Sequence, residues 1–184
     1  MTPAMEITRE QLVDIMPFCP VIRAAILLPH LNAALAEFAI NTPLRVAAFL
    51  AQLAHESAQF RHFEELSSGV QYEGRKDLGN TRIGDGKRFK GRGPIQLTGR
   101  TNYRAAGAAL GLPLEKEPRR ASDADVGFRV AGWYWSQRGL NELADKGTEE
   151  AFDKITRAIN GGLNGKILRD NYYRTAKRVL GIGQ

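Results

Sequence analysis

Along most of the chain, apolar residues recur at the three- and four-residue spacing that is typical of amphipathic helices. The first such stretch, from Thr8 to Met16, begins with a residue that caps helices and ends at Pro17. The other stretches with helical spacing or capping signals are residues 21–38, 98–110, 122–138, 148–159 and 166–180, and a stretch from Pro43 that carries His55 and Glu56 near its end. The pattern therefore predicts a mainly α-helical chain.

The helical pattern is interrupted between Ser67 and Gly93, where glycine and polar or basic residues replace it. This profile indicates a long ordered loop or a small hairpin. Loops of such length in compact domains are usually functional. We therefore expect this segment to form part of a functional site.

The length of 184 residues fits one ordinary globular domain, and the formal net charge of +6 favours a polyanionic partner. Nucleic acid, anionic lipid and a bacterial wall all satisfy that charge. The only cysteine is Cys19, which excludes an intramolecular disulfide and a metal site built on several thiolates. Charged residues interrupt the N-terminal apolar stretch, so we expect no signal peptide. The apolar run 21–28 is far shorter than the roughly 20 residues that a membrane span needs.

Histidine spacing does not indicate a metal site. His30, His55 and His62 do not match a metal-ligand pattern, and the sequence after His55-Glu56 lacks the second histidine of a zinc protease helix. We expect no metal and no other cofactor. His55 is expected to pack against, or hydrogen-bond near, the neighbouring acid.

Two carboxyl groups, Glu56 and Glu65, are candidates for acid and base in glycosidic hydrolysis, which needs one protonated and one ionised carboxyl group. Glu56 ends an apolar helix, where partial burial would raise its pKa, although a solvated surface glutamate has the same sequence context. In one continuous helix the two residues would lie about 14 Å apart along the axis and on opposite faces. A catalytic pair therefore predicts a bend between Ser57 and Phe63, and Glu64 remains a rival for the second role.

Other polar and aromatic residues are weaker candidates. Gln96 and Thr98 follow glycines that permit close approach, and their polar groups can orient water or bind sugar hydroxyls. Asn160-Gly161-Gly162 can be a helix C-cap and nothing more. The tyrosines expected to stack on sugars, each of which can equally be a packing residue, are Tyr72, Tyr103, Tyr172 and Tyr173.

Taken together, five motifs resemble glycoside hydrolase family 19, which contains plant chitinases and bacteriophage endolysins. They are His55-Glu56-Ser57, Glu64-Glu65, Gly91-Arg92-Gly93-Pro94-Ile95-Gln96-Leu97-Thr98-Gly99, Asn102-Tyr103 and Ile159-Asn160-Gly161-Gly162. They run in family order over some two-thirds of the chain. The single cysteine and compact loop depart from the plant enzymes and look like the endolysin branch.

The resemblance implies a role for each matching residue. Glu56 is the general acid, Glu65 the general base that gives inversion at the anomeric carbon, and Thr98 helps hold the attacking water. Residues implied to bind the substrate are Gln96, Asn102, Asn160 and Arg169, the last being the arginine of the closing helix, and His55, Tyr72 and Tyr103 complete the candidate set.

The expected fold is a mainly α, lysozyme-like, two-lobed helical domain of residues 1–184, with a loop or small hairpin at the cleft and no separate wall-binding domain. A smaller lobe is expected at about residues 110–143. The implied function is an endolysin that cuts the β-1,4 bonds of peptidoglycan. The alternatives are a chitinase and a catalytically inactive wall-binding module.

The remaining expectations concern partners and location. Peptidoglycan glycan strands are the expected partner and nucleic acid is not, with weak contact to anionic membranes through the basic C-terminal helix and a monomeric state. An endolysin without a signal peptide would stay in the host cytoplasm until a holin-type pore releases it to the periplasmic wall.

Overall fold

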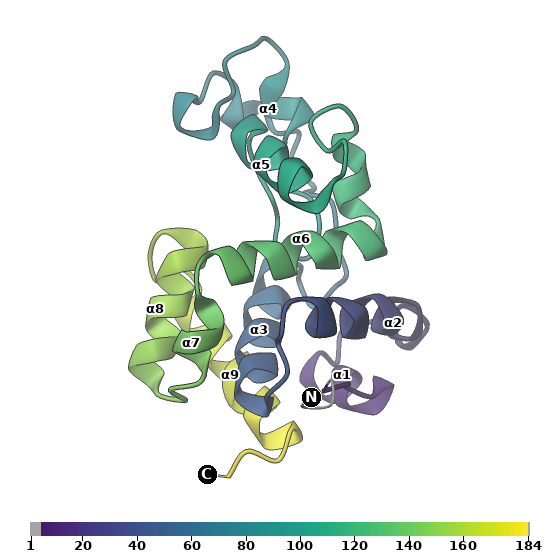
Figure 1. Cartoon of the computed structure of the whole chain (residues 1–184), viewed down its shortest axis with the longest axis vertical. Helices are drawn as coiled ribbons and strands as arrows, with labels where there is room; N and C mark the ends of the chain where they lie inside the picture. Colours follow the sequence, from purple (N-terminus) through teal and green to yellow (C-terminus); the bar gives the residue numbers. More distant parts are fainter. Residues whose placement is uncertain (1–4, 184) are drawn as a thin grey trace.

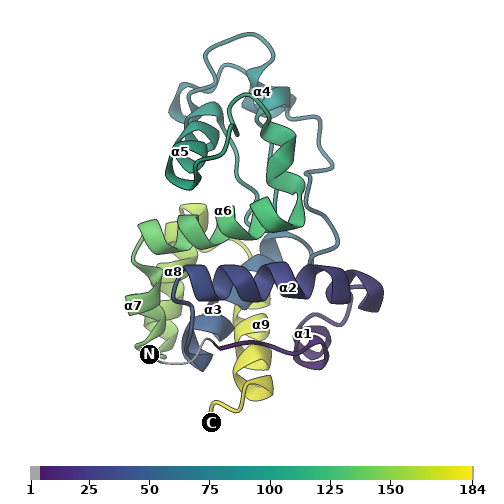
Figure 2. The ribbon, with the colours of Figure 1, turned by 45° about the vertical axis from the view of Figure 1, so that its right-hand side comes forward.

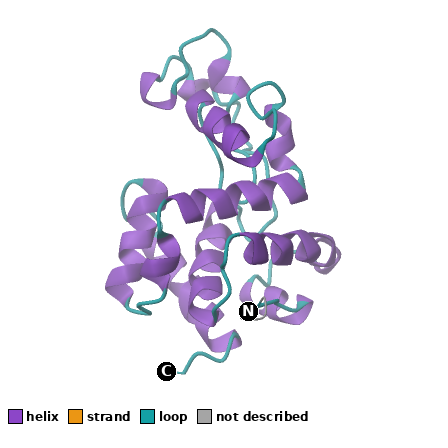
Figure 3. Cartoon of the chain, viewed as in Figure 1, coloured by secondary structure: helices purple, strands orange, loops and turns teal. Residues whose placement is uncertain are grey.

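The computed structural model describes residues 5–183, and it is mostly helical (Figures 1 and 3). The α-helices are α1 (Arg9–Ile15), α2 (Val21–Glu37), α3 (Pro43–Glu56), α4 (Asp85–Arg88), α5 (Arg100–Leu110), α6 (Ala124–Gln137), α7 (Leu140–Ala144), α8 (Glu149–Asn160) and α9 (Lys166–Val179). Three 3₁₀ helices, η1 (Val70–Tyr72), η2 (Lys76–Leu78) and η3 (Pro118–Ser122), lie between them. The predicted mainly α fold is confirmed.

Capping residues set the starts of three of the predicted helices. Thr8 and Gln11 form a capping box at α1, and the side chains of Thr42 and Thr148 accept backbone N–H groups at the starts of α3 and α8. Pro43 occupies the first turn of α3, where its missing N–H costs nothing. The short helix α7 was not expected from the sequence, because five residues carry too little periodicity.

The chain forms a larger and a smaller lobe (Figures 1 and 2). The larger lobe contains α1, α2, α3, α7, α8 and α9, and the smaller lobe contains α4, α5 and the three 3₁₀ helices, while α6 runs along the junction. Helix α6 packs against both α2 and α5. Of residues 110–143, which were expected in a smaller lobe, those up to η3 lie in it, while α6 lies at the junction and α7 in the larger lobe.

Helix α3 is the centre of the larger lobe. Every residue from Val46 to Ala54 is buried, including the polar Gln52, and the most extensive helix pairing is between α3 and α9. Phe49 meets Trp135 of α6 edge to face at 5.3 Å. A helix buried on all sides holds its C-terminal residues firmly, and the end of α3 carries Glu56.

The segment from Ser67 to Gly93 is an ordered loop that contains η1, η2 and α4. Of the expected hairpin, only isolated antiparallel bridges form, from Glu64 to Arg92 and from Arg92 to Leu97. They place the loop ends side by side at the base of the smaller lobe. No helix among residues 5–183 is long and apolar enough to cross a membrane.

Candidate active site

The chain turns sharply just after Glu56, as the catalytic pairing requires. Helix α3 ends at Glu56, and Ala58, Gln59 and Phe60 all adopt left-handed backbone conformations, with φ of 50°, 60° and 61°. Ser57 stabilises the turn, because its hydroxyl donates to the Leu53 carbonyl at 2.6 Å and accepts the Phe60 N–H at 2.9 Å. The predicted break between Ser57 and Phe63 is confirmed.

Three successive non-glycine residues in this conformation store strain of roughly 1–2 kcal/mol each. Contacts from other elements offset that strain. The buried Gln59 side chain accepts the Phe18 N–H at 2.8 Å and donates to the Tyr172 hydroxyl at 2.9 Å. A strained segment held in this way from several sides is typical of functional sites.

Glu56 is mostly buried and lies opposite Arg169 of α9. The Arg169 Nη2 atom donates to Glu56 Oε1 at 2.6 Å, and the two side chains are 2% and 18% exposed, Arg169 being the more buried. Burial raises the pKa of Glu56, and the charge and hydrogen bond of Arg169 oppose that rise only in part. Glu56 is therefore the carboxyl group suited to hold a proton.

Arg169 is fixed by neutral groups on its other sides. It donates to Gln52 Oε1 at 2.5 Å and to the Asn164 carbonyl at 3.0 Å, while Gln52 donates to Thr156 Oγ1 at 2.9 Å. Gln52 precedes Glu56 by one helical turn, so both side chains face α9. The network leaves Glu56 as the one carboxylate that Arg169 meets among the described residues.

His55 lies beside this network against Gly165. A Cβ atom on Gly165 would lie 2.2 Å from the His55 ring, so only glycine leaves room for the imidazole there. Burial, with a smaller contribution from the Arg169 charge, lowers the pKa of His55 to about 4. The imidazole is therefore neutral at neutral pH and packs against Gly165, near Arg169.

This lowered pKa makes stability depend on pH. Between about pH 6.5 and pH 4 the unfolded chain binds a proton at His55 that the folded chain does not, so the free energy of unfolding falls as the pH falls, by at most about 3 kcal/mol. We expect His55→Gln to flatten this slope in urea unfolding measured at pH 4, 5, 6 and 7. The matched control is His62→Gln, at an exposed histidine, which should keep the wild-type slope. Equal slopes in all three proteins would contradict the assignment.

Glu65 lies where the loop ends meet, and its carboxylate accepts from three donors. Gln71 Nε2 donates to Oε1 at 2.9 Å, the Tyr72 hydroxyl donates to the same oxygen at 3.0 Å, and the Gly91 N–H donates to Oε2 at 3.0 Å. No cation pairs with Glu65 within the part of the chain that the structure describes. The three donors therefore fix the position of both carboxylate oxygens of Glu65.

Gln96 and Thr98 lie next to Glu65 around the backbone of Gly91. A Cβ atom on Gly91 would lie 2.7 Å from Gln96 Oε1, 3.2 Å from Glu65 Oε2 and 3.4 Å from Thr98 Oγ1, so three polar side chains converge on one backbone position. Gln96 holds a left-handed φ of 57°, and Thr98 donates to the Gln96 carbonyl at 3.0 Å. Both side chains stay partly exposed, so they can contact water beside Glu65.

Glu64 faces away from this cluster. It pairs with Lys90 at 3.3 Å and with Arg92 at 3.4 Å, and it shares none of the Glu65 donors. Burial alone would raise the pKa of Glu64, but Lys90, Arg92 and Arg119 together lower it. Adjacent residues of an extended segment point to opposite sides, so only one of the two glutamates can face Gln96 and Thr98. That residue is Glu65.

Two expected substrate contacts are corrected by burial. Tyr103 has no exposed surface, and its hydroxyl donates to the Lys90 carbonyl at 2.7 Å, so the ring supports the loop and does not face a sugar. Arg169 is equally buried and positions Glu56 from behind. Sequence spacing does not distinguish a buried tyrosine or arginine from an exposed one.

Two expected asparagine contacts are partly exposed but tied to the backbone. Asn102 donates to the Thr98 carbonyl at 2.8 Å, and Asn160 donates to the Asn164 carbonyl at 3.1 Å and accepts the Gly162 N–H. Gly161 caps α8 in the left-handed conformation, so the Asn160-Gly161-Gly162 motif forms a helix C-cap. Both amides fix the local backbone while leaving surface for a ligand.

Three further residues lie near the site that the sequence pattern did not indicate. Gln52 was assigned to an apolar helix, although its four-residue spacing from Glu56 could have indicated a shared face. Gln71 carries no sequence signal. Tyr134 of α6 is the third: burial raises the pKa of its hydroxyl, and the charge of nearby Glu56 adds a smaller rise.

Comparison with known proteins decides the family. A family model described as chitinase class I matches residues 20–144, which is more than half of the chain. The chain belongs to glycoside hydrolase family 19. It is 35% identical over 162 residues to a family 19 domain protein of Haemophilus influenzae, covering 71% of this chain and 78% of that protein. It is also 40% identical to an endochitinase of Arabidopsis thaliana, covering 74% of this chain and 48% of that protein.

Solved structures of family 19 share the fold over nearly the whole chain. A bacterial family 19 chitinase matches with a TM-score of 0.76 and 26% identity, covering 96% of this chain and 95% of that one. Chitinase C of Streptomyces griseus matches with a TM-score of 0.77 and 24% identity, covering 96% and 94%. The chain therefore shares both the sequence pattern and the fold of family 19. It spans about half the length of the plant relatives it matches.

Proposed function

We propose that this family 19 glycosidase cuts β-1,4 bonds with Glu56 as general acid and Glu65 as general base. The observation that carries the proposal is the contrast between the two carboxyl environments. Glu56 is buried beside Arg169 with a raised pKa, whereas Glu65 accepts three hydrogen bonds and adjoins Gln96 and Thr98. Paired carboxyl groups whose environments differ in this way identify acid and base.

The proposed reaction is a single displacement. Glu56 gives its proton to the glycosidic oxygen as the bond from that oxygen to the anomeric carbon breaks. A water molecule held by Glu65 and Thr98 attacks that carbon from the opposite face and gives a proton to Glu65. The product therefore has inverted configuration, and proton exchange with solvent restores both carboxyl groups.

We further propose that the substrate is peptidoglycan and that the protein is an endolysin. The net charge of +6 suits a wall that carries carboxylates, whereas chitin is uncharged. In this role the protein would act on the periplasmic wall after release from the host cytoplasm by a holin-type pore. A chitinase is the second candidate, because the relatives named above include endochitinases.

Digestion of purified murein and of chitin oligomers tests this proposal. We expect the wild type to release fragments with reducing N-acetylmuramic acid ends, identified by reducing-end labelling and mass spectrometry, and to cut chitin oligomers more slowly. Faster cleavage of chitin would favour the chitinase. If neither polymer is cut although murein is bound, the chain is a wall-binding module.

Helix α9 offers limited support for membrane contact. Ile167 and Leu168 are exposed at its start, but Val179 and Leu180 pack against the core, so its apolar residues do not form one free face. An amphipathic helix needs such a face to enter a membrane surface. We therefore assign the basic residues of α9 to general attraction toward anionic material.

A further inference from the structure

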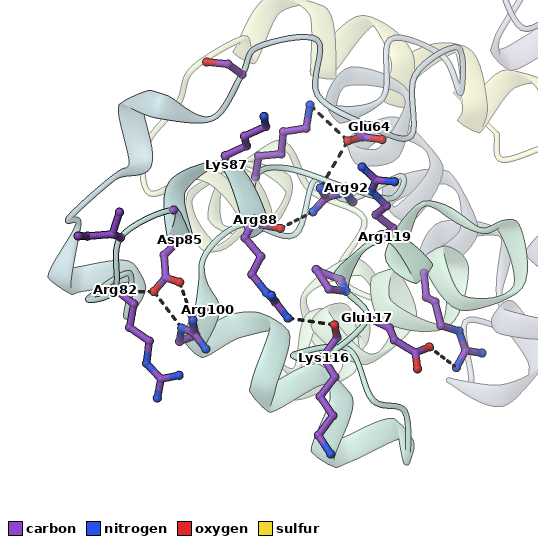
Figure 4. Close-up of a pocket in the computed structure, with 16 residues that line it drawn as sticks. Glu64, Arg82, Asp85, Lys87, Arg88, Arg92, Arg100, Lys116, Glu117 and Arg119 are labelled. Carbon is purple, nitrogen blue, oxygen red and sulfur yellow. Dashed lines mark hydrogen bonds and ion pairs between the residues drawn. The ribbon is translucent and has the colours of Figure 1, made fainter.

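A second candidate site lies on the Glu64 side of the segment that carries Glu64 and Glu65. A hollow of about 1050 Å³ opens among Glu64, residues 82–92, Arg100 and residues 116–120, so it is bounded by α4, the start of α5 and η3 (Figure 4). Glu64 lines this hollow and Glu65 does not. Because the two glutamates point to opposite sides of one segment, the hollow is separate from the proposed catalytic cluster. We call it the basic pocket.

Cations dominate the basic pocket. Nine arginines and lysines line it against three carboxylates. Each of those carboxylates already forms an ion pair. Asp85 pairs with Arg100, Glu117 pairs with Arg120, and Glu64 pairs with Lys90 and Arg92. The lining cations without a carboxylate partner among residues 5–183 are Arg82, Lys87, Arg88, Lys116 and Arg119. Like charges gathered in one hollow repel one another, and a bound anion would relieve that repulsion.

Uncharged acceptors hold several of these cations in place. Arg88 Nη2 donates to the carbonyls of Glu115 and Lys116 at 3.1 and 3.0 Å, and Lys90 Nζ donates to those of Glu65 and Ser67 at 2.9 and 3.2 Å. A carbonyl orients a cation without neutralising it. The pocket therefore presents positive charge whose position is set before any ligand binds.

Arg92 adds an incompletely bonded group. Its side chain is 4% exposed, its Nε atom has no hydrogen-bond partner among residues 5–183, and its Nη2 atom reaches Glu64 only at 3.4 Å. Unpaired buried donors are rare, so each one calls for an explanation. Its Nη1 atom donates to the Arg88 carbonyl at 2.8 Å and to the Tyr103 hydroxyl at 3.2 Å, so the guanidinium is held in place at the edge of the hollow while its positive charge is only weakly paired.

The floor of the pocket is rigid. Arg100 donates to Asp85 at 2.9 Å and to Glu115 at 2.8 Å, and Asp85 is 1% exposed. The ion pairs tie α4 to α5 and to the chain before η3. The hollow is therefore part of the folded lobe and not a gap between mobile side chains.

We propose that the basic pocket binds a ligand with closely spaced phosphate groups, such as a phosphorylated envelope polymer. Arginine and lysine recognise phosphate and carboxylate alike, so the choice between them depends on charge density. Five unpartnered cations require about five carboxylates but only about three phosphates, because each phosphate monoester carries a charge near −2. A pocket of this volume has room for several phosphates on one ligand.

Binding of inorganic tripolyphosphate, measured by calorimetry at constant ionic strength, tests the proposal. The test variant is Lys87→Ala with Arg119→Ala, because neither side chain makes a hydrogen bond or ion pair that the described structure needs. The matched control is Arg174→Ala with Arg178→Ala, which removes the same charge from exposed positions on α9. We expect the first pair to weaken binding roughly tenfold or more and the second pair less than twofold.

Further arms identify the ligand and the ways in which the proposal fails. Vesicles of anionic phospholipid distinguish a lipid headgroup from a soluble phosphate, and either source supports the site. An equal loss of tripolyphosphate affinity in both double variants would show general electrostatic attraction and would overturn the proposed phosphate site. Tighter binding of polyglutamate of equal charge would also overturn it. Murein hydrolysis is measured separately, so loss of the phosphate site and loss of the proposed enzymatic function are distinguishable.

Discussion

Glu56→Gln is expected to lower murein hydrolysis by roughly 10³-fold, because a glutamine cannot donate the proton that the leaving oxygen needs. The amide oxygen still accepts from Arg169, so the buried network and the fold should persist. The matched control is Glu64→Gln. It removes the carboxylate next to Glu65 that faces Lys90 and Arg92, and it should keep near wild-type activity.

A substrate with a better leaving group separates loss of the acid from loss of folding. A nitrophenolate departs without a proton, so cleavage of a nitrophenyl glycoside should be far less impaired in Glu56→Gln than cleavage of murein. The pH profile gives a second readout. Wild-type kcat/KM should fall as the pH rises through the raised pKa of Glu56, and this limb should vanish in the variant. Equal loss on both substrates would contradict the acid role.

The helices and the bend were predictable because they depend on local signals. Thr8, Thr42 and Thr148 mark helix starts with the same chemistry in the sequence and in the structure. The bend followed from a geometric condition, since a straight helix cannot bring Glu56 and Glu65 to one site. The left-handed conformation of residues 58–60 was not predictable, because Gln59 is held by groups more than forty residues away along the chain.

The features of the site that could not be predicted from the sequence depend on packing between residues far apart in the chain. Arg169 reaches Gln52 and Glu56 across α3 and α9, and no local pattern separates a buried arginine from one that contacts a ligand. The lobe boundary could not be predicted for the same reason, because α6 packs on both lobes and its apolar spacing does not show which neighbours it has. The basic residues of the pocket were visible in the sequence, but their gathering in one hollow was not.

Glu65→Ala is expected to reduce hydrolysis by about 10²–10⁴-fold, since no group would then remove the proton from the attacking water. The change leaves the donors Gln71, Tyr72 and the Gly91 N–H without their shared acceptor. A small anion such as azide can take that place and attack the anomeric carbon itself, because it carries no proton that must be removed. We therefore expect added azide to restore turnover at least tenfold in this variant.

The product formed with azide distinguishes a base from a nucleophile. If Glu65 is the base of an inverting enzyme, azide attacks the face that water would use, and a β-linked substrate gives an α-glycosyl azide. A β-glycosyl azide, detected by nuclear magnetic resonance, would instead place a covalent intermediate on the pathway and contradict the proposed mechanism. Azide should not restore murein hydrolysis in Glu56→Gln, because there the missing step is protonation of the leaving oxygen. These opposite rescue patterns assign each carboxyl group to its step independently of the substrate that the protein prefers.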